Sequence, residues 1–181
     1  MKILVVNGKP LSGKDVFCQT IYEKRGLVFP YSTIDEVKLL ATQLGWDGVK
    51  DEKGRKFLSD LKDAMTAYND LPREYVLKQI KQKCELYRST PEIIDDMIFL
   101  IQSRESTDIE RWEKENGARS LLIIKKLETT DVTHWRNHAD DEVWNHSYHY
   151  RLKNFDDLET WKTISLEFID KIRKEKWESH I

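Results

Sequence analysis

The sequence lacks the features that mark membrane-spanning, repetitive or nucleic-acid-coating proteins. No stretch of its 181 residues approaches the ~20 consecutive apolar residues that a transmembrane helix needs. We find no internal repeat and no low-complexity segment. A formal net charge of −2 supplies no general attraction to nucleic acid or to an acidic membrane surface. We therefore expect neither nucleic acid nor a membrane among the partners of this protein.

Cysteine is also scarce, and the two cysteines, Cys18 and Cys84, form no redox or metal motif. They have no CxxC spacing and no further cysteines to pair with. Cys18 lies in an apolar helical pattern that favours a small buried thiol, and we expect no disulfide. The apolar run that ends at Gly8 is too short for a secretory signal peptide. These features together predict a cytoplasmic protein.

What is present is the composition of one globular domain with an α/β pattern. Charged residues make up 34% and apolar residues 39% of the chain, a balance typical of soluble globular proteins. Short apolar runs alternate with segments of helical period, which predicts a five-stranded parallel sheet covered by helices on both faces. Pro30 indicates that the second strand lies at an edge or ends irregularly. The predicted strands are 2–6, 27–32, 97–102, 121–124 and 148–152, and the predicted helices are 14–25, 35–44, 57–68, 72–89, 107–116 and 158–177.

The most specific motif runs from Gly8 to Asp15, between the first predicted strand and the first predicted helix. Gly8-Lys9-Pro10-Leu11-Ser12-Gly13-Lys14 satisfies the G-x-x-x-x-G-K spacing of a Walker A phosphate-binding loop. The glycines let the backbone N–H groups converge on a β-phosphate, and the helix N-terminus adds its positive dipole end. The lysine places a positive charge near the β- and γ-phosphates. The predicted nucleotide-binding residues are Gly8, Lys9, Ser12, Gly13, Lys14, Asp15 and Val16.

Asp15 stands where this motif usually carries the Ser or Thr that touches Mg²⁺. A carboxylate is a good hard-oxygen ligand, directly or through water. Asp15 is therefore the predicted metal ligand, and Mg²⁺ bound together with ATP is the predicted cofactor. The alternative is that Asp15 only caps the N-terminus of the helix, where a negative charge is favoured.

The run Ser12-Gly13-Lys14-Asp15 resembles two groups of P-loop kinases, the phage-type deoxynucleoside monophosphate kinases and the animal-type phosphomevalonate kinases. Both groups carry Asp after the loop lysine. The resemblance is strongest over residues 1–38, weaker over 54–79, and weaker again around Arg104 and in the C-terminal third. It implies a P-loop NTPase fold, a three-layer α/β/α sandwich formed by a single kinase domain over residues 1–181, with acceptor-binding helices at about 35–89 and a small lid at about 125–147.

The resemblance also implies where a phosphorylated acceptor binds. Asp35 and Lys38 match an Asp-x-x-Lys segment that borders the acceptor site, with Asp35 holding a hydroxyl or a base and Lys38 a phosphate. Arg55 matches an arginine that contacts the acceptor phosphate, for which its fork of donors is well suited. The alternatives are a helix N-cap for Asp35 and solvated side chains for Lys38 and Arg55. Lys62 and Tyr68 stand in a segment where the family often has glycine and a further arginine.

Gln102 and Arg104 end the strongest predicted strand, at the sheet edge where α/β proteins bind ligands. Phage-type kinases commonly end this strand in Asp-x-Arg, so Arg104 is kept here while Gln102 replaces a carboxylate near Mg²⁺. Within the lid, Arg136 is the predicted stabiliser of the transferring group, with Lys125 and Lys126 also available to close over the phosphates. An ordinary exposed loop is the alternative for this segment.

His134 and His138 in the same segment have the i, i+4 spacing of a zinc-binding pair. No cysteine is close to them, and no third ligand has a recognisable spacing. Polar lid histidines are therefore favoured over a structural metal site.

The favoured function is a kinase that moves the γ-phosphoryl group of ATP onto a small phosphorylated acceptor. A (deoxy)nucleoside monophosphate is the favoured acceptor. Lys14, Arg104 and Arg136 are the predicted catalytic residues, because phosphoryl transfer is catalysed by positioning and electrostatics. One alternative is phosphomevalonate or a nucleoside as acceptor. Another is a nucleotide-binding regulator without transfer, which the neutral Gln102 favours. No Asn-Lys-x-Asp segment of the GTPase kind follows a strand, and we expect a monomer or a homodimer.

Overall fold

The structure, a computed structural model, describes residues 1–125, 142–144, 146–177 and 179–181. It divides into two compact units. The first unit comprises Met1–Pro30 and Tyr87–Ile181, and it holds the sheet and the phosphate-loop motif. The second unit is Tyr31–Leu86, a group of helices. The predicted α/β class is confirmed, and the bounds of the second unit lie close to those predicted for the acceptor-binding helices.

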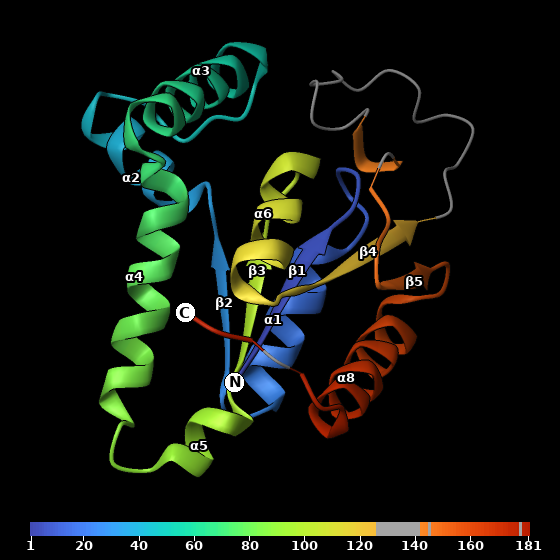
Figure 1. The fold of residues 1–181 in the computed structure, drawn as a ribbon. Coiled ribbons are helices and arrows are strands. Elements are labelled where there is room, and N and C mark those ends of the chain that lie inside the picture. Colours follow the sequence, from blue (N-terminus) through green and yellow to red (C-terminus); the bar gives the residue numbers. More distant parts are fainter. Residues whose placement is uncertain (126–141, 145, 178) are drawn as a thin grey trace. The chain divides into compact units, whose positions relative to one another are not determined.

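The centre of the first unit is a five-stranded parallel sheet with the order β2-β3-β1-β4-β5 (Figure 1). The edge position of β2 agrees with the presence of Pro30, which cannot donate to a neighbouring strand. Val6 in β1 lies beside Gln102 on one side and Leu121 on the other, so the carboxyl ends of three strands meet at one edge. The strands are β1 (Lys2–Asn7), β2 (Val28–Ser32), β3 (Ile98–Gln102), β4 (Arg119–Lys125) and β5 (Tyr150–Asn154).

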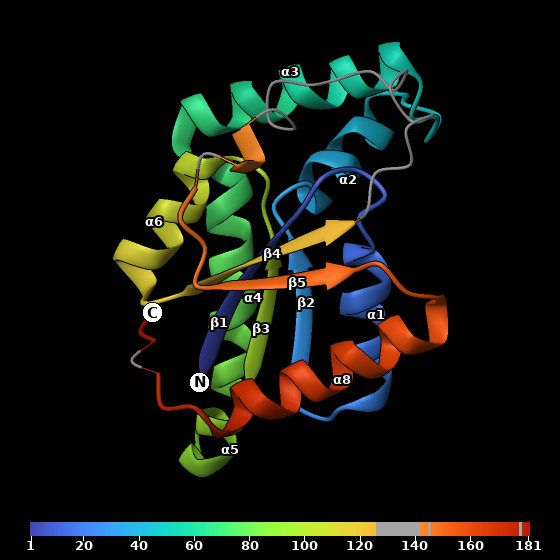
Figure 2. The same cartoon turned by 90° about the vertical axis from the view of Figure 1, so that its right-hand side faces the viewer.

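Helices cover both faces of this sheet. On one face α1 (Lys14–Lys24) and α8 (Leu158–Lys174) lie side by side (Figure 2). On the other face α6 (Ser106–Asn116) packs on β1 and β4. It ends at Gly117, whose φ of +61° makes the left-handed stop that the sequence predicts. The three layers are therefore complete within the first unit.

Alternate strand residues supply the two buried layers, as the period of a strand requires. Leu4 and Val6 belong to the core beneath α1 and α8, where the rings of Phe17 and Trp161 lie 6.1 Å apart. Ile3 and Val5 are equally buried on the opposite face. Burying each such side chain contributes about 1.5–3 kcal/mol to the free energy of unfolding. The phosphate-loop motif therefore begins and ends in elements that belong to the buried core.

The helices of the second unit are α2 (Asp35–Gln43), α3 (Glu52–Asn69) and α4 (Leu71–Leu86), packed around a small core of Val37, Ala41, Leu58 and Met65. Helix α3 starts before the predicted residue 57, because Asp51 accepts the N–H of Gly54 at 2.7 Å and so caps an exposed first turn. Short helix α5 (Pro91–Asp96) is not evident from the apolar pattern, although proline in the first turn is a start signal.

Within the described residues, no helix combines the length and the apolar character that crossing a bilayer requires.

The buried thiol of Cys18 predicts a loss of stability at alkaline pH. Burial raises the pKa of this thiol to about 12, against a smaller opposing effect of its hydrogen bond with Gln102. The unfolded chain releases this proton near pH ~8.5, so the contribution to stability is complete below that pH and is lost as the pH rises towards 12. In urea titrations between pH 8 and 11, Cys18→Ala should therefore show a flatter decline than the wild type. Cys84→Ala, which removes a half-buried thiol, should change the slope less, and equal slopes for all three proteins would contradict the assignment.

Candidate functional site

The phosphate-loop motif spans the turn from β1 to α1, at the carboxyl end of the sheet (Figure 1). Its two glycines are required by close packing as well as by backbone geometry. A Cβ added at Gly8 would lie 2.5 Å from the carbonyl oxygen of Ile123 and 2.6 Å from Ser12 Oγ. A Cβ added at Gly13, where φ is +96°, would overlap the amide of Asn154. The backbone of the loop can therefore approach its neighbours only because both side chains are absent.

The ammonium group of Lys14 lies inside the curve of the loop. The residue is 8% exposed. Nζ donates to the carbonyl oxygens of Gly8 at 2.5 Å and Lys9 at 2.8 Å, and it lies 3.4 Å from Ser12 Oγ. These partners hold a positive charge at the centre of a ring of backbone groups, next to the N-terminus of α1. An anion entering the loop would meet this charge and the positive end of the helix dipole together.

The second half of the loop is held by side chains from distant elements. Asn154, at the end of β5, donates from Nδ2 to the carbonyl oxygen of Ser12 at 2.9 Å. The indole N–H of Trp161 in α8 donates to the carbonyl oxygen of Gly13 at 3.2 Å. Trp161 is also a buried core residue, and no sequence pattern indicates that it donates to the loop. A polar residue at the end of the last strand is the only sequence signal that could have drawn attention to Asn154.

Asp15, the predicted metal ligand, is exposed in the first turn of α1. The N-cap of this helix is Gly13 and it has no side-chain cap, so Asp15 does not cap α1 by a hydrogen bond. Its carboxylate has no hydrogen bond or ion pair with the described part of the chain, where no group of three or more His, Cys, Asp and Glu residues could hold a metal. One free carboxylate beside a phosphate loop fits Mg²⁺ held mainly by phosphate and water oxygens, as this ion prefers.

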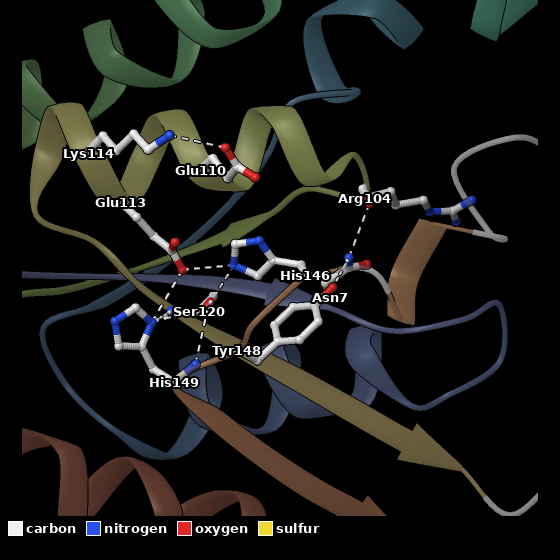
Figure 3. A network of polar contacts seen from close by, with 9 residues as sticks. All are labelled: Asn7, Arg104, Glu110, Glu113, Lys114, Ser120, His146, Tyr148 and His149. Atoms are coloured by element: carbon white, nitrogen blue, oxygen red, sulfur yellow. Dashed lines mark hydrogen bonds and ion pairs between the residues drawn. The ribbon is translucent and has the colours of Figure 1, made fainter.

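Gln102 and Arg104 stand at the carboxyl end of β3, as predicted. Gln102 is beside Val6 in the sheet register, and its side chain lowers the pKa of the Cys18 thiol in α1, against the larger effect of burial. The position at which the kinases that the sequence resembles carry Asp is therefore neutral here. The carbonyl oxygen of Arg104 accepts a hydrogen bond from Asn7 at 3.1 Å (Figure 3). Arg104 is thus tied by its backbone to the residue that precedes the loop.

The three predicted acceptor residues belong to the second unit. Asp35 is not the N-cap of α2, which is Ile34; its Oδ2 accepts the N–H of Ser32 at 3.0 Å. Its Oδ1 lies 3.4 Å from Nζ of Lys38, so these two predicted residues form an ion pair. Arg55 is exposed on the first turn of α3 and donates to the carbonyl oxygen of Lys50 at 2.8 Å. The assignment of all three to an acceptor stays a prediction.

Arg73, in the first turn of α4, is only 7% exposed, which is unusual for an arginine. The sequence pattern did not single it out. Arg73 lies within residues 54–79, where the sequence resembles the kinases named above only weakly.

Most of the predicted lid lies outside the described residues, including Lys126, His134, Arg136 and His138. Lys125 is the exposed last residue of β4. The short 3-10 helix η1 (Glu142–Trp144) resumes the chain. Its Trp144 ring lies 5.7 Å from Nζ of Lys9, within the range of a cation–π contact. One end of the predicted lid therefore contacts the first half of the phosphate loop.

No protein-family profile matches the sequence, and no curated protein matches it either. Solved structures with a similar chain path include TT1252 from Thermus thermophilus, with 16% identity over 94% of this chain and 95% of that one and a TM-score of 0.50. A candidate kinase from Chloroflexus aurantiacus has 12% identity, with 94% and 96% of the two chains covered and a TM-score of 0.45. An unliganded sugar kinase from Janibacter sp. has 14% identity, 94% and 95% coverage and a TM-score of 0.41. The likeness to TT1252 supports the fold, and we draw no functional argument from these similarities.

The packing around Gly13 gives a prediction with a matched control. Gly13 and Gly45 have φ of +96° and +95°, but a Cβ at Gly45 would have nothing within 4 Å. Each substitution by alanine should cost about 1–2 kcal/mol, because an L residue is strained in the left-handed region. Gly13→Ala should cost a further ~1–3 kcal/mol, because its methyl group overlaps Asn154 and crowds Trp161. Urea unfolding measures the loss in unfolding free energy for each variant. Equal losses would show that the close packing at Gly13 adds nothing to the cost of the substitution.

Proposed function

We propose that this protein is a kinase that transfers the γ-phosphoryl group of ATP to a small phosphorylated acceptor, with a (deoxy)nucleoside monophosphate as the favoured acceptor. The observation that carries the proposal is the position of Lys14. Its ammonium group is 8% exposed and lies within a glycine loop at the carboxyl end of a parallel sheet. A triphosphate that enters the loop would meet this ammonium group at its centre.

Each element of the loop has a part in this proposal. Backbone N–H groups at the start of α1 bind the β-phosphate, and Lys14 neutralises the charge shared by the β- and γ-phosphates. Mg²⁺ bound with ATP would neutralise further negative charge, and Asp15 would hold it directly or through water. Arg104, at the end of β3, and Arg136 spread the charge that develops during transfer. Arg136 enters from the sequence alone.

The acceptor is assigned to the second unit. Arg55 and Lys38 would bind its phosphate, and Asp35 would hold a hydroxyl or a base. Support comes from their sequence match to kinases that use nucleoside monophosphates, and from the Asp35–Lys38 ion pair, which brings the two side chains together. Phosphomevalonate or a nucleoside on the same scaffold is the nearest alternative.

A second candidate function is an ATP-binding regulator that does not transfer phosphate. The observation that favours it is the neutral side chain of Gln102 at the end of β3, where the kinases that the sequence resembles carry a carboxylate. With that carboxylate missing, Asp15 is the acidic side chain of the described site left to support Mg²⁺.

Replacing the loop lysine tests nucleotide binding. Lys14→Ala should weaken ATP binding about 10- to 100-fold, because it removes charge-assisted hydrogen bonds worth about 1.5–3 kcal/mol. Isothermal titration calorimetry with ATP and Mg²⁺ measures the loss. The control is Lys24→Ala, which removes an exposed lysine from the last turn of the same helix and should leave the affinity unchanged. An unaltered ATP affinity in Lys14→Ala would refute the loop assignment.

Transfer is tested by following ADP release with each nucleoside monophosphate, phosphomevalonate and a nucleoside. We expect acceptor-dependent ADP release with a nucleoside monophosphate. Arg55→Ala should then raise the KM for the acceptor about tenfold, without changing the KM for ATP, because it removes one charge-assisted contact. The control Lys56→Ala removes the neighbouring exposed cation, which is paired with Asp60 at 2.7 Å. ATP binding without ADP release for any acceptor would favour the regulator.

A further inference from the structure

The side chain of Asn7, the last residue of β1, joins three segments at the carboxyl end of the sheet (Figure 3). Its Oδ1 accepts the N–H of Gly8 at 2.7 Å. Its Nδ2 donates to the carbonyl oxygen of Arg104 at 3.1 Å and to the hydroxyl oxygen of Tyr148 at 2.7 Å. One amide thus connects the start of the phosphate loop, the end of β3 and the segment that leads into β5.

An amide is suited to this position because it must accept one hydrogen bond and donate two. Asn7 is fully buried, so any of these groups left without a partner would lack water as a substitute. A carboxylate could not donate to the two oxygens, and an apolar side chain would leave the Gly8 N–H unpaired. The orientation of the amide is fixed only while all three partners stay in place.

Tyr148 is itself held firmly. It is 9% exposed, and its ring meets that of His146 edge to face, with centroids 4.8 Å apart. His146 is in turn 3.0 Å from Glu113 Oε1 in α6 and 3.3 Å from Ser120 Oγ in β4. Burial raises the pKa of Tyr148 to about 12, so the hydroxyl stays neutral at physiological pH. The Tyr148 hydroxyl is therefore a neutral, well-packed acceptor for the hydrogen bond from Asn7.

We propose that Tyr148 is a positioning residue for the phosphate-binding loop. By accepting the hydrogen bond from Asn7, it fixes the amide that sets the Gly8 N–H and the Arg104 carbonyl in their places. The first half of the loop is then held by Tyr148 through Asn7, as the second half is held by Asn154 and Trp161. The proposal rests on the proposed function, since it assigns Tyr148 a part in the binding of triphosphate.

The Lys9–Trp144 contact supports the same assignment. Trp144 and Tyr148 are only four positions apart in the sequence. The Trp144 ring lies 5.7 Å from Lys9 Nζ, and the Tyr148 hydroxyl lies 2.7 Å from Asn7 Nδ2. The two contacts flank Gly8, whose close approach to Ile123 leaves little room for displacement. Loss of the Tyr148 hydroxyl would let the Asn7 amide turn and so release the Gly8 N–H from its set direction.

The test compares two tyrosine hydroxyls. Tyr148→Phe keeps the ring and its packing on His146 but removes the oxygen that faces Asn7. The control Tyr150→Phe removes a hydroxyl that accepts from Arg119 at 2.7 Å and contacts Glu175, in a cluster separate from the loop. Both variants should lower the midpoint of urea unfolding. Only Tyr148→Phe should weaken the binding of ATP, by about tenfold, whereas Tyr150→Phe should stay within about twofold of the wild type.

Two further measurements separate positioning from a general loss of stability. Inorganic tripolyphosphate should lose affinity for Tyr148→Phe by the same factor as ATP, since the effect is on the phosphate loop. Combining Tyr148→Phe with Asn7→Ala should weaken binding no more than Asn7→Ala alone, because one residue acts through the other. The proposal is overturned if Tyr148→Phe and Asn7→Ala weaken ATP binding by independent factors that multiply in the double variant. It is also overturned if Tyr148→Phe and Tyr150→Phe bind ATP with equal affinity.

The outcome for Lys14→Ala distinguishes this inference from the proposed function. If Lys14→Ala retains full ATP affinity, the loop assignment fails and the positioning role fails with it. If Lys14→Ala loses ATP while Tyr148→Phe binds it as tightly as Tyr150→Phe does, the loop assignment stands and the positioning role alone is wrong.

Discussion

The ammonium group of Lys14 is almost entirely removed from water, and the surrounding structure is arranged to make that possible. Burying a charge is costly unless it is paired with polar groups. The carbonyl oxygens of Gly8 and Lys9, at 2.5 Å and 2.8 Å, supply those groups, and they point inward only because the loop turns tightly at two glycines. The charge at the centre of the site is thus a consequence of the backbone path, and any ligand that replaces the carbonyl oxygens must bring negative charge with it.

Residues from several helices and strands fix that backbone path. The carbonyl oxygens of Ser12 and Gly13 accept from Asn154 and Trp161, and Trp161 also packs against Phe17 within the core. Helix α8 therefore stabilises the loop both by apolar contact and by a hydrogen bond. On the other side, Asn7 links the loop to β3 and to Tyr148. A loop held at both ends loses little entropy when it binds phosphate, which is the physical advantage of preorganisation.

The electrostatic character of the site differs from that of the kinases it resembles. Gln102 occupies the end of β3, and because its amide side chain is neutral, this position carries no charge. The carboxylate of Asp15, exposed in the first turn of α1, does stand next to the loop. A metal ion bound here would depend more on phosphate oxygens and water than on the protein. In the proposed function, the missing carboxylate therefore bears on phosphoryl transfer rather than on nucleotide binding.

The sequence by itself determined the features that depend on near neighbours. Apolar runs of strand length and helical periods predicted the five strands and most helices, because these patterns repeat within a few residues. The spacing of Gly8, Gly13 and Lys14 predicted the loop for the same reason. Short helix α5 and the early start of α3 at Asp51 escaped the pattern, since a capped polar turn has no apolar period. Tertiary structure alone decided that Tyr148 contacts Asn7, 141 positions away in the sequence, and that Asn154 contacts Ser12, 142 positions away. Such contacts are set by the order in which strands join the sheet, and no local pattern encodes that order.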